Sequence, residues 1–153
     1  MAGPVTDADF MGIALGEARL AAAEGEVPVG AVLVRNGQVI ARAHNRVEQT
    51  GDPTAHAELL CLRAAAAAEK GWRMGDCTMY VTLEPCAMCA GALVNARLGR
   101  LAFGAFEPHT GCCGSVFDLT DHAFLHTIPT VGGLMEEECG TVLSAFFAQK
   151  RKR

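Results

Sequence analysis

The sequence predicts an α/β fold with three layers, α/β/α, in which a mixed five-stranded sheet is flanked by helices. After an opening helix and hairpin, strand-like and helical segments alternate along the chain, a pattern typical of a sheet covered by helices on both faces. Of its 153 residues, 50% are hydrophobic and 20% are charged, as in ordinary well-packed domains. Because the chain contains no repeat or linker, we expect residues 1–153 to form a single domain.

The N-terminal part is predicted to be a helix followed by a hairpin. Thr6 can cap a helix over residues 7–23, with Asp9 at the capping-box position. Two strand-like runs follow, and Asn36-Gly37 between them is a strong signal for a two-residue hairpin turn. These runs span residues 27–35 and 38–43.

Turns and apolar patterns place the remaining elements. Gly51-Asp52-Pro53 forms a turn into a second helix, and Pro85 opens a third. Pro129 places the last strand at an edge or a bulge. The predicted ranges are a helix to 70, a strand at 79–83, a helix to 97, strands at 100–106 and 125–131, and a helix at 136–150. The third and fourth strands are joined through a helix, so we expect them to be parallel.

Two short motifs carry the chemistry: His56-Ala57-Glu58, and Pro85-Cys86-Ala87-Met88-Cys89. One imidazole and two thiolates give Zn²⁺ three protein ligands and leave the fourth tetrahedral position open for water, as in catalytic zinc sites. A carboxylate two residues after the imidazole could move protons to and from that water. The motifs therefore indicate a hydrolytic zinc site.

The spacing fits two helix starts that meet at one metal. Residues two apart on a helix are separated by about 200° around its axis, so His56 and Glu58 can share a site only in the first turn. Cys86 and Cys89 are three apart and lie on one helical face. The partial positive charge of a helix N-terminus also favours thiolates.

Each motif alone has a simpler interpretation. A single Cys-x-x-Cys is also typical of a redox pair or half of a structural zinc site, and a single His-x-Glu is usually a surface helix. Together they form the known signature of zinc deaminases, whose general mechanism is established. The adjacent Cys112 and Cys113 can rarely both reach one metal, so we interpret them as buried small hydrophobic residues.

Composition limits which cellular compartment and which binding partners are expected. The net charge of −4 does not favour nucleic-acid binding by bulk electrostatics, although Lys150-Arg151-Lys152-Arg153 could hold phosphates or remain solvated. No apolar run is long enough to span a membrane, and the first residues do not resemble a secretion signal. Seven cysteines without such a signal indicate a reducing cytoplasm.

The sequence resembles the cytidine-deaminase-like fold and, within it, the bacterial tRNA-specific adenosine deaminases. The resemblance covers nearly the whole chain. It rests on the two zinc motifs together with the surrounding segments Glu26–Val32, Asp52–Glu58, Tyr80–Ala92, Phe103–Ala105, Thr110-Gly111 and Gly114-Ser115.

The resemblance implies hydrolytic conversion of adenosine to inosine at the wobble position of a tRNA anticodon. It implies one Zn²⁺ per subunit, held by His56, Cys86 and Cys89, with Glu58 as the catalytic proton carrier. The anticodon stem-loop would be the partner and the enzyme a homodimer. Substrate contacts would come from Asn45, Ala57, Glu84 and Glu107.

Two segments depart from the pattern of that family. Glu107 stands where aspartate is expected and His109 where lysine is common, and Leu125-His126-Thr127 replaces an expected Asn-His-Arg. Either RNA docking is altered here or these residues merely pack their loops. Phe146 and Phe147 could stack on bases, although helix packing is the commoner role.

Three other functions share part of this evidence. The chain could deaminate a free nucleobase or nucleoside such as guanine or cytosine. It could also be a zinc-stabilised binding module without catalysis, or a thiol redox protein that uses Cys86 and Cys89.

Overall fold

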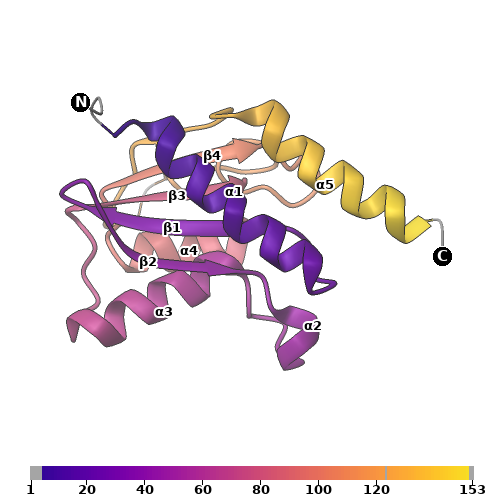
Figure 1. Ribbon diagram of the computed structural model, residues 1–153. Helices are drawn as coiled ribbons and strands as arrows, with labels where there is room; N and C mark the ends of the chain where they lie inside the picture. Colours follow the sequence, from indigo (N-terminus) through magenta and orange to yellow (C-terminus); the bar gives the residue numbers. More distant parts are fainter. Residues whose placement is uncertain (1–4, 123, 152–153) are drawn as a thin grey trace.

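A computed structural model describes residues 5–122 and 124–151, and it confirms a five-stranded mixed sheet between two helical layers (Figure 1). Lys152 and Arg153 of the basic C-terminal run lie outside the described residues. The elements in chain order are α1 (Asp7–Ala23), β1 (Gly30–Arg35), β2 (Gln38–His44), α2 (Val47–Thr50), α3 (Ala57–Glu69), β3 (Cys77–Leu83), α4 (Ala87–Asn95), β4 (Arg100–Ala105), β5 (Thr130–Val131) and α5 (Glu136–Arg151).

The strand order is β2-β1-β3-β4-β5. β1 pairs antiparallel with both β2 and β3, whereas β3 pairs parallel with β4 and β4 with β5. The parallel pairing of β3 and β4 across α4 confirms the sequence prediction. Asn36 and Gly37 have φ of 51° and 75°, the left-handed conformation that a tight hairpin turn requires.

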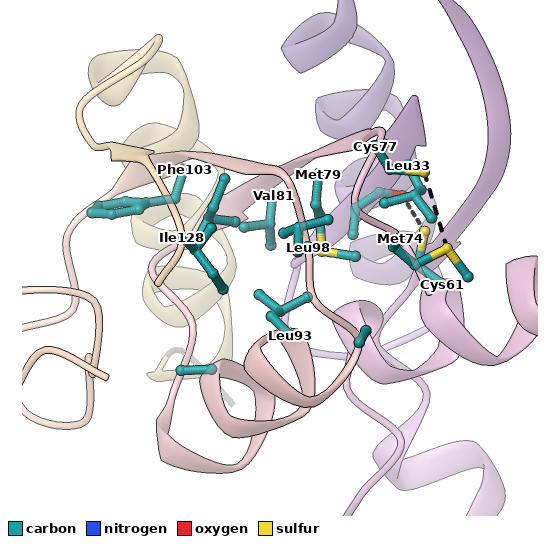
Figure 2. Packing of buried hydrophobic residues seen from close by; sticks show 14 of the residues in the cluster. Leu33, Cys61, Met74, Cys77, Met79, Val81, Leu93, Leu98, Phe103 and Ile128 are labelled. Atoms are coloured by element: carbon teal, nitrogen blue, oxygen red, sulfur yellow. Dashed lines mark hydrogen bonds between the residues drawn. The ribbon is translucent and has the colours of Figure 1, made fainter. Parts of the chain in front are cut away.

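The two faces of the sheet bury separate cores. α1 and α5 lie on one face, and α3 and α4 on the other (Figure 1). In the larger core, Met79 and Val81 of β3 lie above Leu93 of α4 (Figure 2). On the opposite face, Phe10 packs against Tyr80 with ring centroids 5.3 Å apart. The sheet is therefore fixed from both sides.

Close helix packing depends on two glycines in the strands. A Cβ at Gly30 would collide with the carbonyl oxygen of Ala14 in α1, and one at Gly104 would collide with the Cys139 sulfur in α5. Glycine therefore allows both helices to lie directly against the sheet.

Several boundaries differ from the predictions. The first strand begins at Gly30 instead of residue 27, because the amide of Val29 bonds the carbonyl of Val27 in a tight turn and Pro28 has no N–H for a ladder. α3 begins only at Ala57, and the short α2 was not predicted. The third strand begins at Cys77, two residues early, and the α4 helix ends at Asn95.

The predicted fifth strand over residues 125–131 is wrong except for Thr130–Val131. Ile128 instead donates its amide to the carbonyl of Thr120, and the Pro129 carbonyl accepts from Leu101. The segment thus approaches the sheet edge as a loop, and only its end joins the ladder.

Within residues 5–122 and 124–151, the helices are all too short or too polar to cross a bilayer. All seven cysteines are free thiols, and Cys61, Cys77 and Cys139 are buried.

Candidate metal centre and active site

Two helix starts converge on one point. His56 is the N-cap residue of α3 and Cys86 is that of α4, and both have extended backbones, with φ/ψ of −76°/150° and −77°/178°. The side chain of an N-cap residue leaves the helix at its end. Glu58 lies in the first turn of α3 and Cys89 in the first turn of α4. The predicted convergence is confirmed, although the two helices begin three and two residues later than expected, at Ala57 and Ala87.

The distances among the three ligand candidates fit a zinc ion. The Nδ1 atom of His56 lies 3.7 Å from the Cys86 sulfur and 3.5 Å from the Cys89 sulfur. All three ligand atoms lie within 4.8 Å of one another. With Zn–N of about 2.0 Å and Zn–S of about 2.3 Å, a tetrahedral site places nitrogen and sulfur about 3.5 Å apart. His56, Cys86 and Cys89 can therefore hold one Zn²⁺ with little rearrangement.

Hydrogen bonding within this cluster stabilises one thiolate. Hydrogen bonding from Cys89 lowers the pKa of Cys86 to about 3, with a further contribution from His56 that burial only partly offsets. The same bond raises the pKa of Cys89. The bond with Cys86 raises the pKa of His56 as well, against the effect of burial. The cluster thus holds a thiolate, the form of cysteine that binds metals.

Glu58 lies beside the cluster with its carboxyl almost wholly buried, at 4% exposure. Burial raises its pKa to about 7, although its own backbone amide and the nearby His56 oppose the shift. A carboxyl with this pKa can both accept and release a proton near neutral pH.

A cavity of about 300 Å³ opens beside the cluster, within the size range of small-molecule sites. Its lining includes His56, Ala57, Glu58, Cys86, Asn45 and Glu84, together with Glu26, Val27, Val29, Val47, Glu48, Leu83 and Thr110. Six of the eight predicted site residues therefore line one cavity. Cys89 belongs to the metal cluster but does not line the cavity, and neither does Glu107.

Asn45 offers an unused hydrogen-bonding group to this cavity. Its Oδ1 atom is buried and has no hydrogen-bond partner within the described part of the chain. The backbone N–H of Asn45 donates to the Val29 carbonyl, and this bond fixes the main chain next to the site. Since an unpaired buried carbonyl oxygen is unfavourable, Asn45 is well placed to accept a hydrogen bond from a ligand.

Glu84 organises the loop that follows β4. Its carboxylate accepts the backbone amides of Glu107, Cys113 and Ser115, each at 3.0 Å, and also the Ser115 hydroxyl. Burial opposes the charge, but these bonds lower the pKa of Glu84 below its usual value. The Glu84 side chain is thus committed to the loop, and only its main chain remains for a ligand.

The Glu107 carboxylate also forms a hydrogen bond within this loop. One of its carboxylate oxygens accepts the His109 amide at 2.9 Å. Thr110, three residues later, reaches the cavity wall instead. His109 itself is largely exposed.

The other cysteines and histidines lie outside the metal cluster. Cys113 is buried as predicted, whereas Cys112 is only half-buried. His126 bonds the Leu98 carbonyl at 2.6 Å, so it ties its loop to the main chain. Phe146 and Phe147 pack edge to face, with centroids 5.4 Å apart.

Sequence reasoning missed the part of the wall contributed by Glu26 and α2. The Glu26 carboxylate is fully buried and accepts the amides of Glu48 and Gln49 at 3.0 and 2.7 Å. A buried glutamate next to Val27-Pro28 could not be recognised as a helix cap, because α2 spans only four residues.

Comparison with known proteins agrees with this geometry. The family model for the cytidine and deoxycytidylate deaminase zinc-binding region matches residues 4–105. The tRNA-specific adenosine deaminase of Bacillus subtilis (strain 168) is 50% identical over 145 residues, covering 94% of this chain and 90% of that protein.

Two solved structures share the fold. One, from studies of A-to-I editing by tRNA:A34 deaminases at the wobble position of transfer RNA, has a TM-score of 0.82 and 44% identity, covering 88% of this chain and 98% of that one. The guanine deaminase of Bacillus subtilis has a TM-score of 0.64 and 32% identity, covering 95% and 94%. The chain therefore belongs to the zinc-binding cytidine and deoxycytidylate deaminase family, in the group of the tRNA-specific adenosine deaminases.

Proposed function

We propose that this protein hydrolyses adenosine to inosine at the wobble position of a tRNA anticodon. The observation that carries the proposal is the buried Glu58 carboxyl beside a His-Cys-Cys cluster at the wall of a nucleoside-sized cavity. The likeness to tRNA-specific adenosine deaminases supports the choice of substrate. The domain responsible would comprise residues 1–153.

In this proposal His56, Cys86 and Cys89 hold the zinc ion. A bound zinc ion supplies the Lewis acidity that makes water nucleophilic near neutral pH. Asn45, the main chain of Ala57 and the main chain at Glu84 would hold the edge of the base. Glu107 would act indirectly, since its carboxylate bonds within the loop that carries Thr110.

Glu58 carries the protons of the reaction. As the oxygen of water bonds to C6 of adenine, the carboxylate takes one proton from that water and passes it to N1 of the ring. It then passes the second proton to the amino group, the bond from C6 to that nitrogen breaks, and ammonia leaves. Inosine and ammonia are formed from adenosine and water, and Glu58 is regenerated.

The anticodon loop suits such a cavity, because unstacked bases of a single-stranded loop can enter a pocket without melting a duplex. We also propose a cytoplasmic homodimer. Phe117 and Phe124 support the homodimer, since both are about half exposed and both pack on His122, with centroids 5.1 and 5.4 Å apart. Exposed aromatic groups of this kind are enriched at subunit interfaces.

The decisive experiment compares substrates. Purified protein is incubated with an anticodon stem-loop that carries adenosine at the wobble position, and products are identified by nuclease digestion and mass spectrometry. A matched stem-loop carries its adenosine one position away, and free adenosine, guanine and cytosine are tested beside them. We expect inosine only in the first RNA.

Turnover confined to free guanine or cytosine would establish the alternative function, deamination of free bases. The likeness to a guanine deaminase supports testing this alternative. Activity that survives the change Glu58→Gln would contradict the proposed chemistry. A binding module or a redox protein would show neither reaction, and a reversible Cys86–Cys89 disulfide without zinc would identify the latter.

A further inference from the structure

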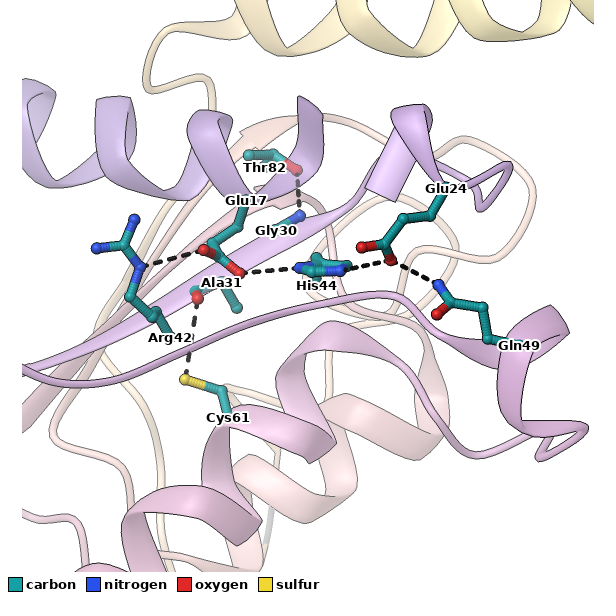
Figure 3. A network of polar contacts seen from close by, with 9 residues as sticks. All are labelled: Glu17, Glu24, Gly30, Ala31, Arg42, His44, Gln49, Cys61 and Thr82. Carbon is teal, nitrogen blue, oxygen red and sulfur yellow. Dashed lines mark hydrogen bonds and ion pairs between the residues drawn. The ribbon is translucent and has the colours of Figure 1, made fainter. Parts of the chain in front are cut away.

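His44, the last residue of β2, connects two acidic groups across the end of α1 (Figure 3). Its Nδ1 lies 2.9 Å from Glu17 Oε1, and its Nε2 lies 2.9 Å from Glu24 Oε1. The same Glu24 oxygen accepts from the side chain of Gln49 at 2.6 Å. On the other side, Glu17 is paired with Arg42 at 3.1 Å. A continuous polar chain thus runs from β2 through α1 to α2.

The geometry defines the charge of the His44 ring. A neutral imidazole has one donor nitrogen, whereas the imidazolium ion has two. Both ring nitrogens face carboxylates, so only the imidazolium can satisfy both. Burial opposes the charge, but the bonds to Glu17 and Glu24 outweigh it and raise the pKa of His44. The charged groups around the ring are Glu17 and Glu24 at α1 and Arg42 on β2, with Arg46 near Glu24.

This polar chain ends at the wall of the cavity. Asn45 follows His44 directly, and Val47 and Glu48 of α2 line the cavity beside it. α2 has only four residues, too few to be stable alone. Two carboxylates attach it to the protein: Glu26 through backbone amides and Glu24 through the Gln49 side chain. The second attachment depends on His44, which holds Glu24 in place.

We propose that His44 is a positioning residue: its imidazolium form holds α2 and Asn45 against the substrate cavity, so substrate affinity falls when His44 loses its proton. This inference rests on the proposed function, because Asn45 and α2 are taken to contact the nucleoside.

The order in which the contacts are lost follows from burial. Glu17 has a side-chain exposure of 9% and Glu24 one of 41%. When one proton leaves His44, the remaining proton stays on Nδ1, because Glu17 is the more buried of the two carboxylates and loss of one of its donors costs more there than at the solvent-exposed Glu24. The unprotonated Nε2 then faces Glu24, and two acceptors repel each other. Glu24 turns to solvent and releases Gln49, and α2 loosens.

The first test follows the protein by NMR as pH rises. We expect the His44 ring signal to titrate with a midpoint above that of a free histidine, and the backbone amides of Glu48 and Gln49 to shift with the same midpoint. In Glu24→Gln the midpoint should fall. Amides of α2 that do not follow the His44 titration would overturn the proposal, whether or not the protein deaminates RNA.

The second test measures KM and kcat for the anticodon stem-loop across the same range. For the wild type we expect KM to rise by about fivefold or more as the pH passes through the His44 midpoint, within the usual range of such couplings. The pH dependence of kcat should show no change at that midpoint. His44→Gln should show the high KM at every pH. The control is Glu69→Gln, which breaks an ion pair with Arg35 at the end of β1. Its KM should follow the wild-type pH dependence.

An unchanged KM profile in His44→Gln would refute the positioning role. If the protein deaminates no RNA at any pH but the NMR coupling is observed, the proposed function fails and the structural link from His44 to α2 is supported.

Discussion

At the scale of single residues, Glu58 carries the most specific prediction. Glu58→Gln keeps the shape of the side chain but removes its ability to take a proton from water. We expect turnover of the stem-loop to fall by about 10²–10⁴, the usual contribution of general acid–base catalysis. Zinc content, measured by elemental analysis, should remain at one ion per chain. Loss of zinc together with activity would mean that Glu58 is structural.

The cysteines allow a matched comparison. Cys89→Ala removes a ligand candidate, and we expect the purified protein to lose its zinc and its turnover. Cys112→Ala changes a half-buried cysteine that is not a ligand candidate. Cys112 follows Gly111, and Gly111 forms an isolated β-bridge with Cys86. This control should keep the zinc. Equal zinc loss in both variants would contradict the assigned ligand set.

The ligand candidates could be recognised in the sequence because the spacing within each motif places His56 with Glu58, and Cys86 with Cys89, at the start of a helix. Asn45 and Glu84 could be expected only from resemblance, and resemblance did not reveal what Glu84 does. Its carboxylate bonds amides of Glu107, Cys113 and Ser115, which lie up to 31 residues away. No local pattern encodes contacts across such a separation.

At the scale of the elements, the contact between α1 and β1 can be tested at one glycine. Gly30→Ala places a methyl group against the backbone of Ala14, and we expect a loss of about 1–3 kcal/mol in the free energy of unfolding. In Gly12→Ala, a control within α1, the new methyl meets nothing within 4 Å. That change should add about 0.5–1 kcal/mol, because alanine favours helices. Urea unfolding measures both, and an equal loss in both would disprove the close packing.

The loop after β4 should respond to acid through Glu84. Its pKa is lowered in the folded protein, so its contribution to stability is present above the pKa of the unfolded chain and lost as pH falls through the folded value. Glu84→Gln should reduce the free energy of unfolding at pH 7 by about 1–3 kcal/mol and flatten its decrease as the pH falls below 4.5, the ordinary pKa of glutamate. A variant with the wild-type acid slope would exclude this role.

The elements that sequence analysis placed well are those with local signals. The helix cap at Thr6, for example, forms the expected reciprocal bonds with Asp9. Residues 125–129 were misassigned because their apolar pattern suits a strand, whereas the actual partner of Ile128 is the Thr120 carbonyl. The four residues of α2 lack any periodicity, and their cap, Glu26, lies 22 residues before Glu48.

At the scale of the whole molecule, the metal should contribute to folding. A ligand that binds only the folded state at 100 times its Kd stabilises that state by about 2.7 kcal/mol. We therefore expect a strong chelator to lower Tm by about 5–10 °C, and restored zinc to reverse the change. Cys89→Ala should show the same Tm with and without chelator. An unchanged Tm in the wild type would show that zinc does not bind here.

The fold as a whole could be predicted because alternating elements leave few arrangements for a covered sheet. The order β2-β1-β3-β4-β5 brings the starts of α3 and α4 together, although His56 and Cys86 are 30 residues apart. The substrate wall could not be predicted in the same way, since Glu26, Val47 and Thr110 come from separate segments.

The His-Cys-Cys cluster and Glu58 lie at the starts of two helices. The cavity wall at Thr110 belongs instead to a loop whose backbone amides donate hydrogen bonds to the Glu84 carboxylate. Reactivity and recognition are thus built as separable modules joined at a single carboxylate. An engineer could exchange the segment between Glu107 and Cys113 for one of different length, keep all three amides that bind Glu84, and redirect the same hydrolytic machinery to another amino-bearing base.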